Sequence, residues 1–393
     1  MFAKSKYLFL NFFIVFFFLF SACSMKRDQL DKSCLNVQIS LFKGSINKLN
    51  ISSPEDFGGG LRAVEIFQDT LAYVLPTKPI DKIFIIDLKN QKFLAPIHLD
   101  RNFITAPSGI QAISSDSIFV SEQNFPQIHL IDNNGVVLES VNLYRENLWK
   151  MPKEGFPNFG LYFGFGKTFH YDKSRNSLFF PLKQLDIWYF VQEKNKFPVF
   201  AEYSLSTNQF LGLHGEYPGV YGSKLNSLLP FFLSHPIMEV FEKQIILSYP
   251  LDEELFVYDL DGNFLFKKCA SISDFHLGLP LEYDMENFDS EGLRKYHLTN
   301  SYFGNFFFIS GLNKFSRIFL KSLITSQGTC KAKKVFVMTF DINLDLESVT
   351  ELPIEYPCNY FTYQTAYNKG VLSKSSVVDD DLFPLSDIIL LDN

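Results

Sequence analysis

The stretch that decides the fold runs from residue 117 to residue 143 and reads SIFVSEQNFPQIHLIDNNGVVLESVNL. A first apolar strand at 117–121 is followed by a polar loop and by a second, largely apolar strand at 127–132. The Asn133-Asn134-Gly135 turn then leads to a third strand at 136–143. Asn-Gly between apolar runs is a strong hairpin signal, because both central turn residues must take a positive φ. The stretch therefore predicts three consecutive antiparallel strands.

The same unit of three strands recurs along the chain, and such recurrence is the signature of a repeat fold. Two further copies are clear, with strands at 71–75, 82–87 and 92–99, and at 244–248, 254–259 and 263–268. Two looser copies have strands at 178–182, 197–204 and 209–213, and at 304–310, 334–341 and 346–354, with an extra strand at 317–323. In every copy a polar residue marks the turn after the middle strand: Asp87, Asp132, Ser204, Asp259 and Asp341.

The two ends of the chain can supply a sixth unit. Candidate strands lie at 35–41, 64–67, 370–373 and 387–391. A ring in which strands from both ends share one blade leaves only short, protected sheet edges. We therefore expect an all-β, six-bladed β-propeller over residues 35–393. The alternative is a β-sandwich or an irregular two-domain β protein, and short helices are expected only at 225–233 and 287–298.

The first residues carry the features of an export signal. Lys4 and Lys6 form a short positive region, residues 7–20 are apolar apart from Asn11, and small residues precede Cys23. The apolar run is shorter than the about 20 helical residues that a bilayer core requires. We therefore expect residues 1–22 to be a signal peptide rather than a retained transmembrane helix.

The end of this signal resembles a lipobox, the motif at which bacterial lipoproteins are acylated on cysteine and cut just before it. Ser21-Ala22-Cys23 fits the motif, although Phe20 departs from its usual aliphatic residue. The resemblance implies that Cys23 carries the lipid and that a linker at 23–34 precedes the propeller. The other interpretation is an ordinary signal peptide with an incidental cysteine.

Residues 24–28, Ser-Met-Lys-Arg-Asp, bear on the location of the anchored protein. No aspartate directly follows the cysteine, which is the pattern resembling inner-membrane retention. The acidic cluster typical of surface-exported lipoproteins of Bacteroidota is also missing. These residues favour an outer-membrane lipoprotein of the cell envelope that faces the periplasm.

Taken together, the lipobox, the length and repeats such as residues 118–135 resemble TolB-like six-bladed β-propeller lipoproteins of Bacteroidota. Among these, the chain is most similar to an uncharacterised family defined by a domain of unknown function. The resemblance covers most of the chain after residue 22, and its repeat motif is structural. It implies a location and a fold, and it brings no catalytic residues with it.

Charge and cysteine content narrow the partners. The formal net charge is −7 and no basic stripe is present, which argues against nucleic acid, since binding requires Lys and Arg to neutralise phosphates. After Cys23 the cysteines are Cys34, Cys269, Cys330 and Cys358, and their spacing is not that of a metal site. In an oxidising periplasm, a Cys330–Cys358 disulfide and buried free thiols both remain open.

No catalytic constellation stands out in the sequence. Residues 164–168, Gly-Phe-Gly-Lys-Thr, lack the first glycine of a phosphate-binding loop, and the seven histidines show no paired spacing. Asp259, Asp261 and Asn263 alternate as calcium ligands do, but a hairpin turn explains Gly262 better. Some propeller enzymes hold a metal in the central channel, and weak candidates of the right residue types are Glu122, Asn124 and Asp186. A cofactor is therefore unknown at this point.

Two long loops, at 144–169 and 214–235, are rich in aromatic residues. Loops are where propellers carry recognition, because the blades fix their bases. The weak binding candidates in these loops are Trp149, Phe159, Tyr162, Tyr217 and Tyr221. We expect a membrane-anchored binding or scaffold module for a protein or glycan partner. The alternative function is a periplasmic hydrolase, lactonase or lyase with a metal in the channel.

Overall fold

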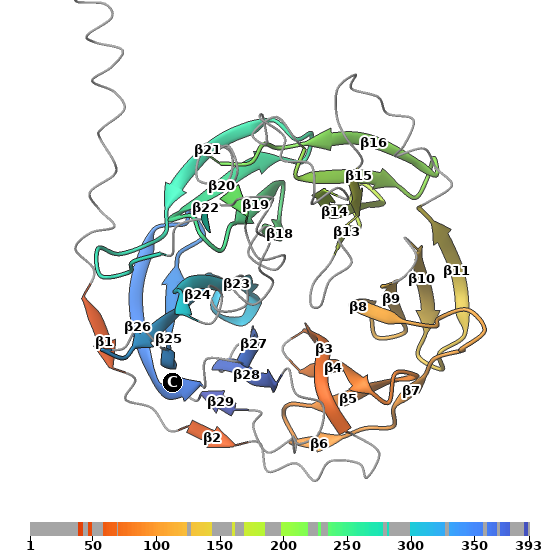
Figure 1. Ribbon diagram of the computed structural model, residues 1–393. Coiled ribbons are helices and arrows are strands. Elements are labelled where there is room, and N and C mark those ends of the chain that lie inside the picture. Colours follow the sequence, from red (N-terminus) through yellow and green to blue (C-terminus); the bar gives the residue numbers. More distant parts are fainter. Residues whose placement is uncertain are drawn as a thin grey trace, which may run out of the picture.

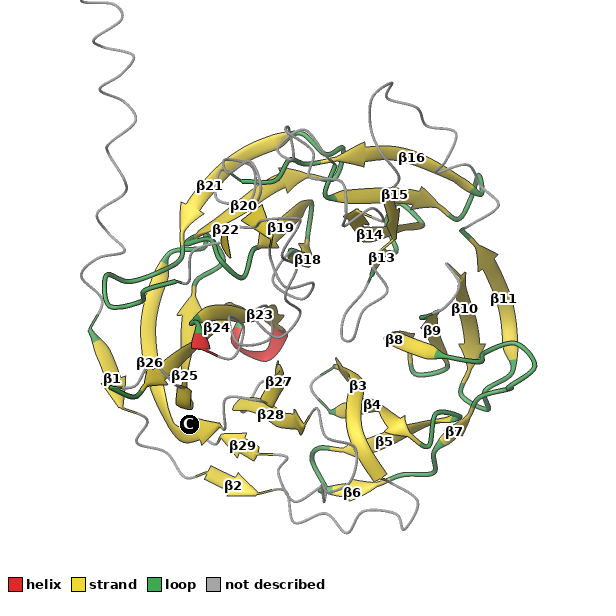
Figure 2. Ribbon diagram, viewed as in Figure 1, coloured by secondary structure: helices red, strands yellow, loops and turns green. Residues whose placement is uncertain are grey.

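A computed structural model describes residues 38–41, 46–48, 58–68, 70–123, 127–143, 159–161, 169–184, 198–218, 227–228, 235–277, 281–282, 299–326, 330–356, 360–367, 370–377 and 389–391. Within these ranges almost all regular structure is β-strand, and the strands form sheets arranged as a ring (Figure 1 and Figure 2). The prediction of an all-β propeller is confirmed. No helix in the described part of the chain is long and apolar enough to cross a membrane.

Five sheets of the ring, here called blades 1 to 5, have side chains that the structure describes. Blade 1 contains β3 (Gly58–Phe67), β4 (Leu71–Lys78), β5 (Lys82–Asp87) and β6 (Lys92–Phe93), with β7 (Ile97–His98) also paired to β5. Blade 2 contains β8 (Pro107–Ser114), β9 (Ser117–Glu122), β10 (Gln127–Asp132) and β11 (Val137–Asn142). Blade 3 contains β12 (Phe159–Leu161), β13 (His170–Asp172), β14 (Ser177–Gln184), β15 (Phe200–Ser204) and β16 (Gln209–His214).

Blades 4 and 5 follow the same order. Blade 4 contains β18 (Ile237–Phe241), β19 (Gln244–Ser248), β20 (Glu254–Asp259) and β21 (Phe264–Cys269). Blade 5 contains β23 (Tyr302–Ile309), the 3-10 helix η7 (Ser310–Leu312), β24 (Lys314–Ile324), β25 (Cys330–Phe340) and β26 (Leu346–Tyr356). In blades 1 to 4 the three predicted strands of each unit are the second, third and fourth strands. An inner strand precedes them in each blade, and the sequence pattern indicated only that of blade 1, through the candidate strand at 64–67 within β3.

A further sheet, here called the closing sheet, joins the two ends of the chain. It has the order β2-β29-β28-β27, with β2 (Ile46–Lys48), β27 (Tyr360–Tyr367), β28 (Gly370–Val377) and β29 (Ile389–Leu391). Ile46 pairs with Leu391, so strands from both ends share one sheet, as predicted. The predicted N-terminal strands lie elsewhere: β1 (Ile39–Leu41) pairs in parallel with β26, and residues 64–67 belong to β3. The closing sheet lies between blade 5 and blade 1 (Figure 1).

Aromatic side chains fill the spaces between blades. Between blades 4 and 5, Phe275 stacks on Phe319 with ring centroids 3.8 Å apart, and Phe336 meets Phe275 edge-on at 5.1 Å. Ile246 and Val257 of blade 4 belong to the same buried cluster. Middle strands are covered on both faces by neighbouring blades, which explains why they read as continuous apolar runs rather than as alternating ones.

The turns after the third strands are built around the predicted polar residues. Asp132 Oδ1 accepts the backbone N–H groups of Asn134 and Val136, and Asp259 Oδ1 accepts those of Asp261 and Asn263. Only one residue per turn takes a positive φ, namely Gly135 at 83° and Gly262 at 81°. The expectation of two such residues was wrong, because each turn is a three-residue loop with a β-bulge instead of a two-residue one.

The connections between blades emerge at one end of the ring. Successive strands of a blade are antiparallel. The loop between the second and third strands therefore lies at the same end of the blade as the segment that leaves the fourth strand for the next blade. We call this end the connection end. Two connections pair there as a small sheet of β17 (Ser227–Leu228) and β22 (Leu281–Glu282). The helix predicted at 225–233 is therefore wrong at 227–228, and 287–298 lies outside the described residues.

Candidate functional site

Glu122, the candidate channel ligand, ends β9 at the connection end and is buried. Its Oε1 accepts the N–H of Thr105 at 2.7 Å, and its Oε2 accepts Thr105 Oγ1 at 3.1 Å and the N–H of Ala106 at 3.0 Å. The carboxylate thus fixes the connection from blade 1 to blade 2. Asn124 and Asp186 lie outside the described residues, so a metal held by the three remains a prediction.

Arg62 and His129 join Glu122 to form what we call the blade 1–2 corner. Arg62, on the inner strand β3, donates from Nη1 to Pro107 O and to Gln123 Oε1, both at 3.0 Å. Burial lowers the pKa of Arg62, and the charge of Glu122 opposes that shift. His129 is buried with its Nδ1 2.8 Å from Ser140 Oγ, and burial lowers its pKa. The corner combines a guanidinium, a carboxylate and an imidazole, and sequence reasoning missed Arg62 because the candidate strand at 64–67 begins after it.

Among the aromatic candidates, Tyr217 is the one whose side chain is described. It packs against the core, with its ring centroid 6.0 Å from that of Tyr249, and burial raises its pKa. Phe159 lies in β12, which pairs with β14 at the connection end, but its side chain is outside the described set. Trp149, Tyr162 and Tyr221 are also outside the described residues. Tyr217 therefore forms part of the base on which its connection rests.

Arg317, on β24, holds the loop between β19 and β20 at the connection end. It is fully buried, and its Nε donates to Ser248 Oγ at 2.9 Å. Its other two nitrogens donate to backbone carbonyls of Tyr249, Asp252 and Ala270 at 2.7–2.9 Å. The guanidinium also lies 3.5 Å from the ring centroid of Phe303. A cation from blade 5 thus fixes a loop of blade 4.

Asp252 lies in the loop that Arg317 holds. Its Oδ1 accepts the N–H of Glu254 at 2.9 Å, and its side chain is buried. Burial raises its pKa to about 6, although Glu254 N–H and the charge of Arg317 both oppose this shift. A carboxyl group that titrates so close to neutrality is a common property of functional sites, but structural networks produce it too.

Lys333, on β25, is a second buried cation in blade 5. Its Nζ donates to Asn300 O at 3.3 Å and lies 4.2 Å from the ring centroid of Tyr302. Burial lowers its pKa to about 7. Lys333 lies near the start of β25, which is also at the connection end. Nothing in the sequence indicates this burial, because Lys331, Lys333 and Lys334 together look like a solvated strand end.

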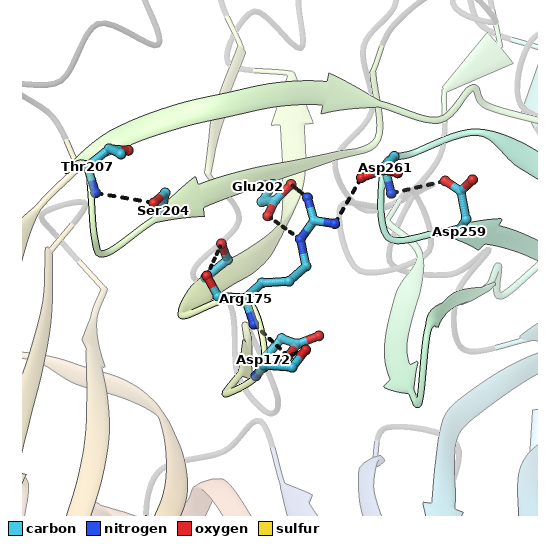
Figure 3. A network of polar contacts seen from close by, with 9 residues as sticks. Asp172, Arg175, Glu202, Ser204, Thr207, Asp259 and Asp261 are labelled. Carbon is cyan, nitrogen blue, oxygen red and sulfur yellow. Dashed lines mark hydrogen bonds and ion pairs between the residues drawn. The ribbon is translucent and has the colours of Figure 1, made fainter.

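At the opposite end of the ring, Arg175 joins blade 3 to blade 4 (Figure 3). It donates from Nε and Nη2 to the two carboxylate oxygens of Glu202 at 2.9 and 3.1 Å, and from Nη1 to Asp261 Oδ1 at 2.8 Å. The His214 ring lies against Gly262, where an added Cβ would overlap it. The interpretation of Asp259, Asp261 and Asn263 as a hairpin turn is confirmed. This network is a structural joint between blades.

The described cysteines behave differently from one another. Cys330 is disulfide-bonded, while Cys269 is not part of a disulfide and its Sγ lies 4.0 Å from Ser271 O. A Cys330–Cys358 pairing therefore remains a prediction. Among the described residues, no three His, Cys, Asp or Glu side chains come together as a metal site would require.

Comparisons with known proteins show the fold and the family. No curated protein matches the chain. A crystal structure of a member of the DUF4221 family from Bacteroides vulgatus aligns with 91% of this chain and 97% of its own, at a TM-score of 0.65 and 13% identity. A putative exported protein from Bacteroides fragilis aligns with 82% of this chain and 77% of its own, at a TM-score of 0.45 and 10% identity. A luciferin-regenerating enzyme aligns with 88% of this chain and 94% of its own, at a TM-score of 0.41 and 12% identity.

At 13% identity and a TM-score of 0.65, the structure from Bacteroides vulgatus establishes similarity of fold and nothing more. The sequence match is more specific, because the family model of a domain of unknown function, DUF4221, matches residues 19–347. That range contains the blade 1–2 corner and all of blades 1 to 4, and it ends inside β26 of blade 5. The chain therefore belongs to the DUF4221 family.

Proposed function

We propose that this protein is a membrane-anchored binding module, a lipoprotein held through Cys23 in the outer membrane and facing the periplasm. Its connection end would engage a protein or a glycan. The observation that carries the proposal is that two connections, each outside the blades, pair with one another through Leu228 and Leu281 of β17 and β22. A structured layer on one end of a rigid ring is the arrangement that recognition requires.

The base of this layer is held by buried polar contacts. Glu122 fixes the connection into blade 2, and Arg317 fixes the loop between β19 and β20. Side chains that are locked by packing and hydrogen bonds keep a binding surface preorganised, which lowers the entropic cost of association. The support for binding is therefore geometric and concentrated at one end.

We further propose that the ring is TolB-like and six-bladed, with the closing sheet as the sixth blade. Three facts support this. The closing sheet has four strands, as blades 2 and 4 do. It lies in the ring between blades 5 and 1 (Figure 1). Its outer strand comes from the N-terminal part of the chain, so sheet pairing closes the ring.

The decisive test breaks the β17–β22 pair without touching a blade. The double variant Leu228→Asp, Leu281→Asp places like charges opposite each other in the pair, which destabilises it. The control is Leu138→Asp, an exposed residue on the outer strand β11. Full-length tagged chains are cross-linked in intact cells and recovered, and the purified chains are probed on a glycan array. We expect a ligand that the control retains and the double variant loses; equal recovery by both would refute binding at this end.

The anchor is tested separately. Cys23→Ser should lower the mass of the mature protein by the lipid group and move it out of the membrane fraction. An unchanged mass and an unchanged membrane fraction would contradict the lipoprotein proposal and leave the binding proposal untouched.

The second candidate function is a hydrolase, lactonase or lyase with a metal in the channel. The observation in its favour is the blade 1–2 corner, where the buried Glu122 and His129 interact electrostatically. Metal analysis of the purified protein discriminates between the two candidates. Stoichiometric calcium or zinc that is lost in Glu122→Gln would favour the enzyme, and a metal-free protein that retains its ligand would favour the binding module.

A further inference from the structure

The N-terminal strand β1 shows at which end of the ring the chain enters. It pairs in parallel with β26, the outer strand of blade 5, and Ile39 lies beside Val349. Strand β26 begins at the turn after β25 and runs toward the connection end. The chain before β1 therefore comes from the opposite end of the ring. We call it the turn end, because the turns between the third and fourth strands of the blades lie there.

The chain enters close to the turn end. Strand β26 starts at Leu346 and ends at Tyr356, so Ile39 lies about 10 Å of strand from its start and about 23 Å from its end. Residues 24–37 separate Cys23 from the first described residue. The inference made here rests on the lipid anchor at Cys23, which is part of the proposed function. Such an anchor is joined to the ring at its turn end.

Exposed apolar side chains lie at the same end, on three blades. Val136 and Phe264 lie at the turns between third and fourth strands of blades 2 and 4, and are 57% and 54% exposed. Ile342 lies at the corresponding turn of blade 5 and is 46% exposed. Leu312, in η7 between the first two strands of blade 5, is 39% exposed. We call these four residues the apolar rim.

A flat partner fits this arrangement. Blades 2, 4 and 5 lie on different sides of the ring (Figure 1), and three separate points define a plane. A bilayer surface contacts all three blades at once, and apolar side chains are stabilised in its interface. We propose that the turn end lies on the bilayer that holds Cys23, with the apolar rim in the interface. The connection end then points away from the membrane, where a partner can reach it.

The contact is apolar rather than electrostatic. The N–H of Val136 holds the pKa of Asp132 below its ordinary value, and the side chain of Asn263 does the same for Asp259. Both carboxylates are therefore ionised at neutral pH and give their turns a negative charge, which anionic headgroups repel. Contact with the bilayer thus depends on burial of the apolar rim, and substitution of the rim should abolish it.

The experiment uses the full chain in living cells. A photo-cross-linking phenylalanine analogue replaces Phe264 in one strain and Phe103 in another. Phe103 is the matched control, because it is a phenylalanine, 53% exposed, at the connection end between β7 and β8. The peptide that carries the analogue is analysed by mass spectrometry. We expect phospholipid on the peptide of position 264 and none on that of position 103.

The outcomes separate this inference from the anchor on which it rests. A chain that is absent from the membrane fraction would overturn both the anchor and the orientation. A membrane-bound chain that is cross-linked to lipid from position 103, from both positions equally or from neither would overturn the orientation alone, and the lipoprotein proposal would stand.

Two double variants test the apolar rim itself, with the cross-linking analogue at position 312. Phe264→Asp with Ile342→Asp changes the rim. Phe103→Asp with Ile324→Asp makes the same changes at the connection end, where Ile324 is 48% exposed at the end of β24. Cross-linking to lipid should fall at least about tenfold in the rim variant and stay constant in the control. Both variants should keep the same melting temperature, since all four positions are exposed. Unchanged cross-linking in the rim variant would count against the membrane contact.

Discussion

Blade 5 buries one cation on each of its two faces, and the two are satisfied in different ways. Arg317 of β24 points to the face of Phe303, Phe319 and Phe336, which packs against blade 4. Lys333 of β25 points to the other face, which it shares with Tyr302. Both cations lie over an aromatic ring of β23. The difference lies in what surrounds the charged nitrogens.

On the face that holds Arg317, each N–H direction of the guanidinium is matched by a hydrogen-bond acceptor. A guanidinium is planar and presents five N–H donors in fixed directions, and the carbonyls of the β19–β20 loop converge on it from blade 4. On the other face, the charge of Lys333 is concentrated on one ammonium group. Burial disfavours this charged form and lowers the pKa of Lys333 to about 7. Arginine can therefore serve as a structural clamp where a lysine responds to pH. The comparison predicts that removal of the two cations has opposite effects on stability.

The largest expected effect follows removal of the arginine. Arg317→Leu leaves the carbonyls of Tyr249, Asp252 and Ala270 buried without their donor, and each such group costs about 1–3 kcal/mol. We expect the free energy of unfolding to fall by about 4 kcal/mol in urea denaturation. The control is Lys314→Met, which removes an exposed ion pair with Glu347 and should change stability by less than about 1 kcal/mol. Equal, small effects in both variants would mean that Arg317 is not a clamp.

The next effect has the opposite sign. The pKa of Lys333 is lowered from 10.5 to about 7 on folding, so the unfolded chain binds more protons between these values. The stability that the neutral amine permits is present above pH 10.5 and is lost as the pH falls to about 7. Lys333→Met should therefore stabilise the protein by about 3 kcal/mol at pH 7, with the gain vanishing near pH 10.5. A gain that is independent of pH would contradict the assignment of this charge.

A smaller effect on stability, at acidic pH, is expected from Asp252 in the loop that Arg317 holds. The pKa of Asp252 is raised from 3.8 to about 6 on folding, so the folded state binds the extra proton. The resulting stability is full below pH 3.8 and is lost as the pH rises through 6. Asp252→Asn should remove this loss and stabilise the protein by about 2 kcal/mol at pH 7. Urea titrations at pH 4 and pH 7 check it, and Asp345→Asn on an exposed turn serves as the control.

How far the sequence could predict these features depends on whether the signal is local. The polar residues that end the third strands, such as Asp132 and Asp259, were recognisable because each one bonds to N–H groups two and four residues later. The turn at Asp341 repeats these bonds, but Leu344 takes the positive φ, at 63°. Leu344 is buried in the cluster between blades 4 and 5. Its packing holds the positive φ there, so no glycine marks this turn in the sequence.

The inner strands of blades 2 to 4 and the two cations could not be predicted in the same way, because their environment comes from other blades. β8 reads PSGIQAIS and β18 reads IMEVF, and neither alternates clearly. Arg317 stands next to Ile318 in a strand that also contains Lys314 and Lys321, so a solvated face was as reasonable an interpretation. Its burial depends on a loop 65 residues away in sequence. The propeller fold and the family could thus be predicted from the sequence, while the site could not.

The smallest expected effect concerns the rings beneath the two cations. A cation over an aromatic face gains about 1–2 kcal/mol when it is desolvated, and the gain requires the charge to be present. A double-mutant cycle isolates this coupling from the loss of packing. Phe303→Leu combined with Arg317→Leu should give about 1 kcal/mol of coupling at every pH from 6 to 9, since arginine stays charged.

For the lysine, the coupling should depend on pH. Tyr302→Leu combined with Lys333→Met should give about 1 kcal/mol at pH 6, where the amine of the folded state is charged. At pH 9 the amine is neutral and the coupling should disappear, while that of the arginine pair stays unchanged. Equal coupling at both pH values in the lysine pair would show that Lys333 keeps its charge, and the two faces of blade 5 would then hold their cations by the same means.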